Sequence, residues 1–175
     1  LSNDSAAGNV VFGNLILRNG NNGIAVDGGD GEIIVNNTTV SNGKKNPGVW
    51  GEGISTYNAS LGNVVQSILT KDNDNDSGNE GIFADVATSV DYSYIEDGLV
   101  GSASLGWGAT NGVNPMFVNP ASVPDGYHLS WNSPAIQTAE PYVPAAPPGA
   151  PPHGSRGYYT IGMRPAERNA STVTV

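Results

Sequence analysis

The chain has no cysteine, so disulfide cross-links, thiolate catalysis and cysteine-based zinc sites are excluded from its 175 residues. Basic residues are scarce: seven Lys and Arg stand against sixteen Asp and Glu, which gives a net charge of −9. Such a chain lacks the positive surface that binds a phosphate backbone, so nucleic acid is not expected as a partner. No apolar run approaches the ~18–20 residues of a membrane-spanning helix, so we expect no membrane span in this chain.

Residues that form turns are abundant instead, with 24 Gly and 12 Pro, while only 13% of the residues are charged. This composition is typical of many short strands joined by tight turns. The length suits one domain with an appended tail. We expect β-strand coils over residues 1–99, a cap over 100–140, and a proline-rich arm with a terminal strand over 141–175.

Two families of short segments recur along the first hundred residues. Each member of the first family is a short strand that ends in a turn, and each member of the second begins with Gly-Ile. The first family comprises Asn14 to Gly20, Asn37 to Gly43, Gln66 to Asp72 and Tyr92 to Gly98, at spacings of 23, 29 and 26 residues. The second comprises Gly23 to Val26, Gly53 to Thr56 and Gly81 to Ala84, at spacings of 30 and 28 residues.

Repeats of this length, built from strands without helical periodicity, predict an all-β parallel solenoid (β-helix) of about four coils. An antiparallel sandwich would also supply strands and turns, but it does not predict aligned Gly-Ile anchors. Stacking of equivalent residues predicts two sets of side chains that point into the solenoid. They are Leu15, Leu17, Thr38, Val40, Ser67, Leu69, Ser93 and Ile95 in one set, and Ile24, Ile54 and Ile82 in the other.

The character of the chain changes near Val100, where it becomes rich in glycine and then in proline. A solenoid end exposes strand edges and core side chains, so it must be capped. We expect large apolar side chains to plug that end, and we expect Trp107 to pack in the cap as well. The plug residues are Phe117, Tyr127, Leu129, Trp131 and Ile136.

Four segments in this part of the chain occur in an order that resembles a known family. They are Val90 to Gly98, Asn114 to Pro120, Asp125 to Leu129 and Ser133 to Ile136. They resemble the C-terminal end of secreted bacterial right-handed parallel β-helix proteins of the choice-of-anchor Q or polymorphic outer-membrane-protein-like type. The resemblance implies a right-handed coil and an extracellular or cell-surface location. Gln137 and Thr160 stand where the family motifs have Asp, and the structural role of the cap is implied all the same.

The acidic run from Asp72 to Glu80 predicts a metal site. Alternating carboxylates in a loop can converge on one Ca²⁺ ion, which prefers six to eight oxygen ligands. The predicted ligands are Asp72, Asp74, Asp76 and Glu80, although a solvated acidic turn would have the same composition. The run is not an EF-hand, because no flanking helices are expected. Asp27, Asp30 and Glu32 form a weaker candidate of the same kind.

Aromatic and basic residues supply candidates for binding and catalysis. An aromatic face suits the apolar side of a sugar ring, and this predicts Trp50 and Tyr57 as ligand contacts. A polysaccharide lyase would need a basic residue as proton acceptor, and Arg18 and Lys71 are the candidates for that role. Solvated turn charges explain Arg18 and Lys71 equally well.

Taken together, these features predict a non-catalytic extracellular or cell-surface segment that acts in surface recognition, glycan binding or filament assembly. Its expected partners are a polysaccharide or neighbouring copies of itself, with Ser171 to Val175 as a free strand for assembly. The alternative is part of a polysaccharide lyase or glycoside hydrolase whose main site lies in further coils.

The predicted calcium site has a direct test. Titration of the chain with calcium in a calorimeter should release heat, because the cation neutralises the closely spaced carboxylates of Asp72, Asp74 and Asp76. The Asp74→Ala variant should bind calcium more weakly. Absence of heat at millimolar calcium would reject the site.

Overall fold

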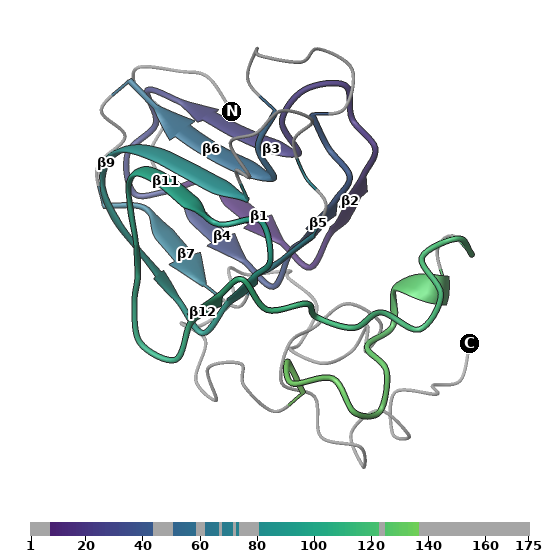
Figure 1. Ribbon diagram of the computed structural model, residues 1–175. Helices are drawn as coiled ribbons and strands as arrows, with labels where there is room; N and C mark the ends of the chain where they lie inside the picture. The colour runs from purple at the N-terminus through teal and green to yellow at the C-terminus, as the bar shows by residue number, and fades with distance from the viewer. Residues whose placement is uncertain are drawn as a thin grey trace, which may run out of the picture.

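A computed structural model describes residues 8–43, 51–58, 62–66, 68–71, 73, 81–122 and 125–136 (Figure 1). Within these ranges the chain is all-β, with twelve strands, one short 3₁₀ turn and no α-helix. No helix there is long and apolar enough to span a membrane. The elements are β1 (Val10–Phe12), β2 (Leu15–Leu17), β3 (Ile24–Asp27), β4 (Ile33–Val35), β5 (Thr38–Val40), β6 (Ile54–Tyr57), β7 (Val64–Gln66), β8 (Leu69–Lys71), β9 (Ile82–Asp91), β10 (Tyr94–Ile95), β11 (Leu99–Leu105), β12 (Thr110–Asn111) and η1 (Asp125–Tyr127).

Every pairing between these strands is parallel, as the sequence predicted. One sheet has five strands in the order β12-β10-β8-β5-β2, and the other strands form a second, curled sheet. Each set of three consecutive strands therefore pairs with the next set along the chain, and we call each set a repeat. The first repeat is β1, β2 and β3, and the second is β4, β5 and β6 (Figure 1). The long strand β9 ends the third repeat and begins the fourth, because its start pairs with β6 and its end with β7.

The Gly-Ile anchors stack as predicted, with Ile24 beside Ile54 and Ile54 beside Ile82. A fourth member that the sequence comparison missed, Leu99, stands beside Ile82. Glycine precedes each of these strands because the repeats approach closely there: a Cβ atom on Gly53 would lie 2.7 Å from the carbonyl oxygen of Gly81. Any side chain at this position would force the repeats apart.

The alignment of the first family is wrong in the third and fourth repeats. Leu15 stands beside Thr38, then Leu69, then Tyr94, so Leu69 and Tyr94 occupy the places predicted for Ser67 and Ser93. Aligning the segments by sequence alone, without gaps, takes no account of the tertiary contacts that determine the register of the strands. Ile68 is fully buried in the core, and this burial places β8 two residues further along the chain than predicted.

The predicted inward set is also partly wrong, because the five-stranded sheet packs apolar side chains on both faces. Its inner face contributes Ile16 and Ile95 to the core cluster that contains Ile24, Ile54 and Ile82. The predicted inward residues Leu15, Leu17, Val40 and Leu69 belong instead to a second cluster on the outer face. Side chains alternate along a strand, so Leu15 and Leu17 must both face away from Ile16.

The C-terminal segment, whose described residues are 113–122 and 125–136, covers that outer face. Phe117, Tyr127 and Leu129 pack in one cluster with Val40 and Leu69 of the sheet, and Ile136 lies against this cluster. The predicted apolar contacts therefore exist, but they cover the side of the sheet along several repeats and do not plug its end. Two predictions of packing are wrong: Trp131 is 89% exposed and Trp107 is 77% exposed.

A row of hydrogen-bonded side chains joins the repeats at one corner, and we call Asn19, Asn42, Asn73 and Asp97 the amide ladder. The Nδ2 of Asn19 donates to the Oδ1 of Asn42 at 2.9 Å, and the Nδ2 of Asn42 donates to the Oδ1 of Asn73 at 2.8 Å. Asn73 Nδ2 donates in turn to Asp97 Oδ2 at 3.0 Å. Each acceptor oxygen also accepts a hydrogen bond from the backbone N–H of the same donor residue, so the backbone amides at this corner are satisfied by the ladder. Asn73, which lies within the acidic run from Asp72 to Glu80, is thus part of the repeat structure.

The Asn42→Ala variant should lower the free energy of unfolding by about 2–4 kcal/mol, because Asn42 is buried and its side chain makes several hydrogen bonds, and an unsatisfied buried partner costs about 1–3 kcal/mol. These bonds join the side chain of Asn42 to the N–H and Nδ2 of Asn19, the carbonyl oxygen of Ile16 and the Oδ1 of Asn73. Urea unfolding followed by circular dichroism measures the change. Asn111→Ala is the matched control, since Asn111 is exposed and also precedes a glycine. A loss for Asn42→Ala no larger than for this control would contradict a stabilising role of the ladder.

Candidate ligand-binding groove

A groove of about 610 Å³ lies where the C-terminal segment meets the end of β8. Its polar lining comes from Lys71, Asn114, Ser130 and Asn132, and its apolar lining from Met116, Phe117, Val118, Pro120 and Trp131. Lys71 is the one basic residue in this lining, and no Asp or Glu contributes to it among the described residues. The groove is therefore free of acidic lining in a chain whose net charge is −9.

The backbone around the groove is held by several hydrogen bonds. Phe117 and Leu129 form an antiparallel bridge, and the N–H of Ser130 donates to the carbonyl oxygen of Met116 at 2.8 Å. The buried hydroxyl of Ser133 donates to the carbonyl oxygen of Pro115 at 2.6 Å. Ser133 thus serves the packing of the segment. These bonds give the exposed side chains a defined backbone from which to project.

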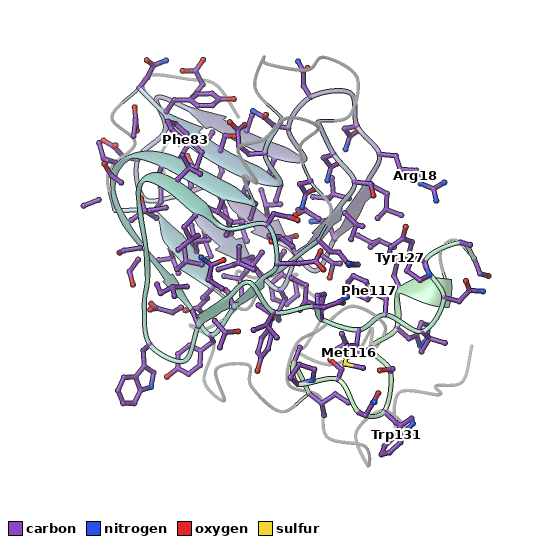
Figure 2. All side chains as sticks on the ribbon, in the orientation of Figure 1. Arg18, Phe83, Met116, Phe117, Tyr127 and Trp131 are labelled. Atoms are coloured by element: carbon purple, nitrogen blue, oxygen red, sulfur yellow. The ribbon has the colours of Figure 1, made fainter. Side chains whose placement is uncertain are left out.

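Trp131 stands at the outer edge of the groove. Its indole is almost entirely exposed, whereas Phe117 and Tyr127 of the same segment lie on the side toward the strands (Figure 2). The Phe117 and Tyr127 rings meet edge to face with centroids 5.4 Å apart, and this pair anchors the segment. The groove thus combines a fixed inner wall with a free aromatic face at its rim.

The polar side chains of the groove keep donors available. Asn114 accepts the N–H of Met116 through its Oδ1 at 2.7 Å, and Asn132 accepts the hydroxyl of Ser130 through its Oδ1 at 2.7 Å. Both asparagines use their oxygen for local turns. The side-chain nitrogen of each has no partner within the described ranges and can donate to a ligand.

Lys71 points outward from β8 and forms an ion pair. Its Nζ lies 2.6 Å from the Oε1 of Glu96. Glu96 directly follows Ile95, which pairs with Thr70, so Lys71 and Glu96 occupy neighbouring positions at the ends of β8 and β10. Both side chains are largely covered, so their positions are constrained. An ammonium in such a pair carries no lone pair, so it can orient a ligand oxygen but cannot accept a proton.

The structure does not join Arg18 to Lys71 as a catalytic pair. Lys71 and Leu17 lie in the same row of the sheet on either side of Val40, two strand spacings or roughly 10 Å apart. Arg18 follows Leu17 at a corner with a φ of 55°, is exposed and does not line the groove. Figure 2 shows Arg18 well apart from Trp131 and Met116.

Tyr57, a predicted ligand contact, lies at the end of β6 and outside the groove. Its hydroxyl accepts the Nδ2 of Asn22 at 2.6 Å, and its ring is tilted against Phe83 with centroids 6.5 Å apart. Burial raises the pKa of the Tyr57 hydroxyl, and the nearby carboxylate of Glu52 raises it further. Trp50, the other predicted contact, lies outside the described residues.

The predicted calcium ligands Asp72, Asp74, Asp76 and Glu80 also lie outside the described residues. The weaker candidate is not supported, since no group of three or more potential metal ligands occurs in the described part of the chain. The carboxylate of Asp27 accepts a hydrogen bond from the side-chain amide of Asn58, and Asp27 lies beside Tyr57 in the pairing of β3 with β6. Glu32, by contrast, is completely buried.

Glu32 is buried with half of its carboxylate unpartnered. Its Oε1 accepts the Nδ2 of Asn9 at 2.9 Å, but its Oε2 accepts no hydrogen bond from any described residue. A buried charge with incomplete hydrogen bonding is unfavourable, because it loses its hydration without full replacement. Glu52 is nearly as buried, yet its Oε2 accepts the hydroxyl of Ser55 at 2.6 Å.

The Glu32→Gln variant should raise the free energy of unfolding by about 1–3 kcal/mol, because a neutral amide is less costly to bury and its oxygen can still accept from Asn9. Thermal unfolding measures the change. The matched control is Glu52→Gln, which should give no such gain. A lower unfolding temperature for Glu32→Gln would show that its carboxylate has a partner that stabilises it.

Sequence reasoning missed Asn114, Met116 and Asn132 as groove residues, because it treated their segment as an end plug. The signal that the sequence offered was Trp131, one of only three tryptophans in the chain, but we expected its side chain to be buried in the cap. Comparisons with protein-family models, curated proteins and solved structures give no match. The groove is therefore defined by the geometry of this chain.

Proposed function

We propose that this chain is a segment of an extracellular, right-handed parallel β-helix protein that recognises carbohydrate through the Trp131 groove without catalysis. The right-handed winding is supported by general chain geometry, because connections between parallel strands of one sheet are right-handed in about 98% of cases. The resemblance of the C-terminal segments to secreted β-helix proteins supports the same winding and the extracellular location.

The observation that carries the proposal is the exposure of Trp131 at the rim of the groove. An exposed indole on an ordered backbone offers a flat apolar face, and this suits the C–H side of a sugar ring. The groove volume lies within the ~300–1,000 Å³ that small-ligand sites occupy. Exposing the apolar indole of Trp131 to water is unfavourable, and a bound ligand that covers the indole would remove this cost.

The polar lining fits the hydroxyl side of a sugar. The amide nitrogens of Asn114 and Asn132 can donate to hydroxyl oxygens, and Lys71 adds a charged donor at the inner end of the groove. Among the described residues no carboxylate lines the groove, so this lining does not repel a neutral or mildly acidic saccharide. A glycan is thus a better fit than a cationic ligand.

The groove is less suited to catalysis. Hydrolysis of glycosides uses two carboxyl groups on either side of the bond, and the described lining holds none. A lyase needs a basic group that can accept a proton, and the groove amine is held in an ion pair with Glu96. Recognition therefore accounts for the lining better than a lyase or a hydrolase site does.

Glycan-array binding tests the proposal. The Trp131→Ala variant should bind its glycans at least tenfold more weakly, which corresponds to about 1.4 kcal/mol of binding free energy. Trp107→Ala is a matched control, because Trp107 is also highly exposed but does not line the groove. Equal losses in both variants, or unchanged binding by Trp131→Ala, would contradict the role of the groove.

An activity screen on neutral and acidic polysaccharides separates recognition from catalysis. The unmodified chain should produce no cleavage products. Turnover that Lys71→Ala or Arg18→Ala abolishes would overturn the non-catalytic proposal in favour of a lyase.

A further inference from the structure

Hydrogen-bond donors predominate among the polar side chains that line the groove. Lys71, Asn114 and Asn132 each present a side-chain nitrogen, and Ser130 is the other polar side chain in the described lining. The Oδ1 of Asn114 accepts the N–H of Met116 at 2.7 Å. A backbone N–H can donate only to the amide oxygen, so this bond fixes the orientation of the Asn114 amide and identifies its other terminal atom as the nitrogen donor.

Several oxygens around the groove are already engaged within the fold. The Oδ1 of Asn132 accepts the hydroxyl proton of Ser130 at 2.7 Å. The carbonyl oxygens of Met116 and Ser130 accept the N–H groups of Ser130 and Ser133, at 2.8 and 2.9 Å. The described lining is therefore richer in donors than in acceptors, and it suits a ligand group that accepts hydrogen bonds and donates none.

Lys71 supplies the charge in the described lining. Its Nζ lies 2.6 Å from the Oε1 of Glu96, and the two side chains are only 16% and 24% exposed. Glu96 does not line the groove, so the ion pair presents its cationic member to a ligand there. Hydrogen bonds to a charged partner are stronger than those between neutral groups, and an anionic oxygen beside Lys71 thus gains more than a hydroxyl does.

We propose that the groove selects a saccharide that carries an anionic oxygen group, either a carboxylate or a sulfate ester, beside Lys71. This inference rests on the proposed carbohydrate function and names the ligand class of the same site. The sugar ring stacks on Trp131, and the anionic group accepts hydrogen bonds from the donors of the lining. An ionised carboxylate or sulfate has no proton to donate, so it needs none of the engaged oxygens.

Matched pairs of oligosaccharides test this selection. Oligomers of galacturonate, glucuronate and mannuronate are compared with their methyl esters, and sulfated galactose oligomers with their desulfated forms, by calorimetry in calcium-free buffer. At least one anionic form should bind the full chain at least about tenfold more tightly than its neutral counterpart. A preference for carboxylates alone, or for sulfates alone, supports the proposal and identifies the group. Equal affinities within every pair would overturn it.

The absence of calcium from the buffer keeps the role of Lys71 separate from that of the predicted calcium site. A calcium ion can hold a carboxylate or sulfate of a ligand, and the acidic run from Asp72 to Glu80 directly follows Lys71 in the chain. Of that run, the structure describes only Asn73. A preference for anionic saccharides that appears only after calcium is added would assign the preference to calcium and overturn the proposal.

Substitutions in the ion pair should change the preference in opposite directions. Glu96→Gln keeps the size of the side chain but removes the negative charge beside Lys71, so the ratio of anionic to neutral affinity should rise about threefold. The Lys71→Gln/Glu96→Gln double variant removes both charges and leaves no covered carboxylate unpaired, and its ratio should fall about tenfold or more. A ratio that does not rise in Glu96→Gln, or does not fall in the double variant, would contradict the proposal.

The Trp131→Ala variant distinguishes failure of this inference from failure of the proposed function. Trp131 is expected to contact the sugar ring of charged and neutral ligands alike, so its loss should weaken binding of both members of a pair. Binding of both members through Trp131 without preference overturns the selection of an anionic group and leaves carbohydrate recognition in place. Absence of binding by every saccharide, or binding that Trp131→Ala does not weaken, overturns the proposed function itself.

Discussion

Hydrogen bonds between corner side chains hold successive repeats in register, and the other features depend on that register. Strand pairing by itself allows a strand to slip, but the amide ladder joins Asn19, Asn42, Asn73 and Asp97 in one row. A slip of one residue would turn every inward side chain outward and break these bonds. The ladder therefore determines which side chains enter the core and which form the outer surface on which the C-terminal segment packs.

The five-stranded sheet carries apolar side chains on both faces, and both faces are covered. Ile16 and Ile95 fill the interior, while Val40, Leu69 and Tyr94 receive Phe117 and Tyr127 from the C-terminal segment. Parallel sheets are usually buried on both faces for this reason. The segment that provides the cover also forms a wall of the groove. The position of Trp131 is thus a consequence of packing on the outer face, and the groove depends on the same contacts that complete the fold.

The distribution of charge is consistent with the proposal that the groove binds a ligand without catalysis. The chain is strongly acidic, yet the lining of the groove has no carboxylate among the described residues and places Lys71 in an ion pair with Glu96. Buried acids lie elsewhere: Glu52 is bonded to Ser55, and Glu32 is bonded to Asn9. Glu32 and Glu52 therefore take part in hydrogen bonds within the fold and do not line the groove.

Local pattern in the sequence determined the parallel all-β arrangement and the stacking of Ile24, Ile54 and Ile82, because a close approach that admits only glycine marks each anchor strand. It did not determine the register of β8 and β10, since an alignment without gaps cannot weigh the burial of Ile68 or the bond between Asn42 and Asn73. The sequence also did not determine on which face of the sheet Leu15 and Leu17 lie, because leucine fits either face of a sheet that is covered on both. Only the tertiary structure decided that the C-terminal segment lies along the side of the sheet. Whether Phe117 is buried or Trp131 exposed depends on contacts between residues far apart in the chain, and no local pattern contains that information.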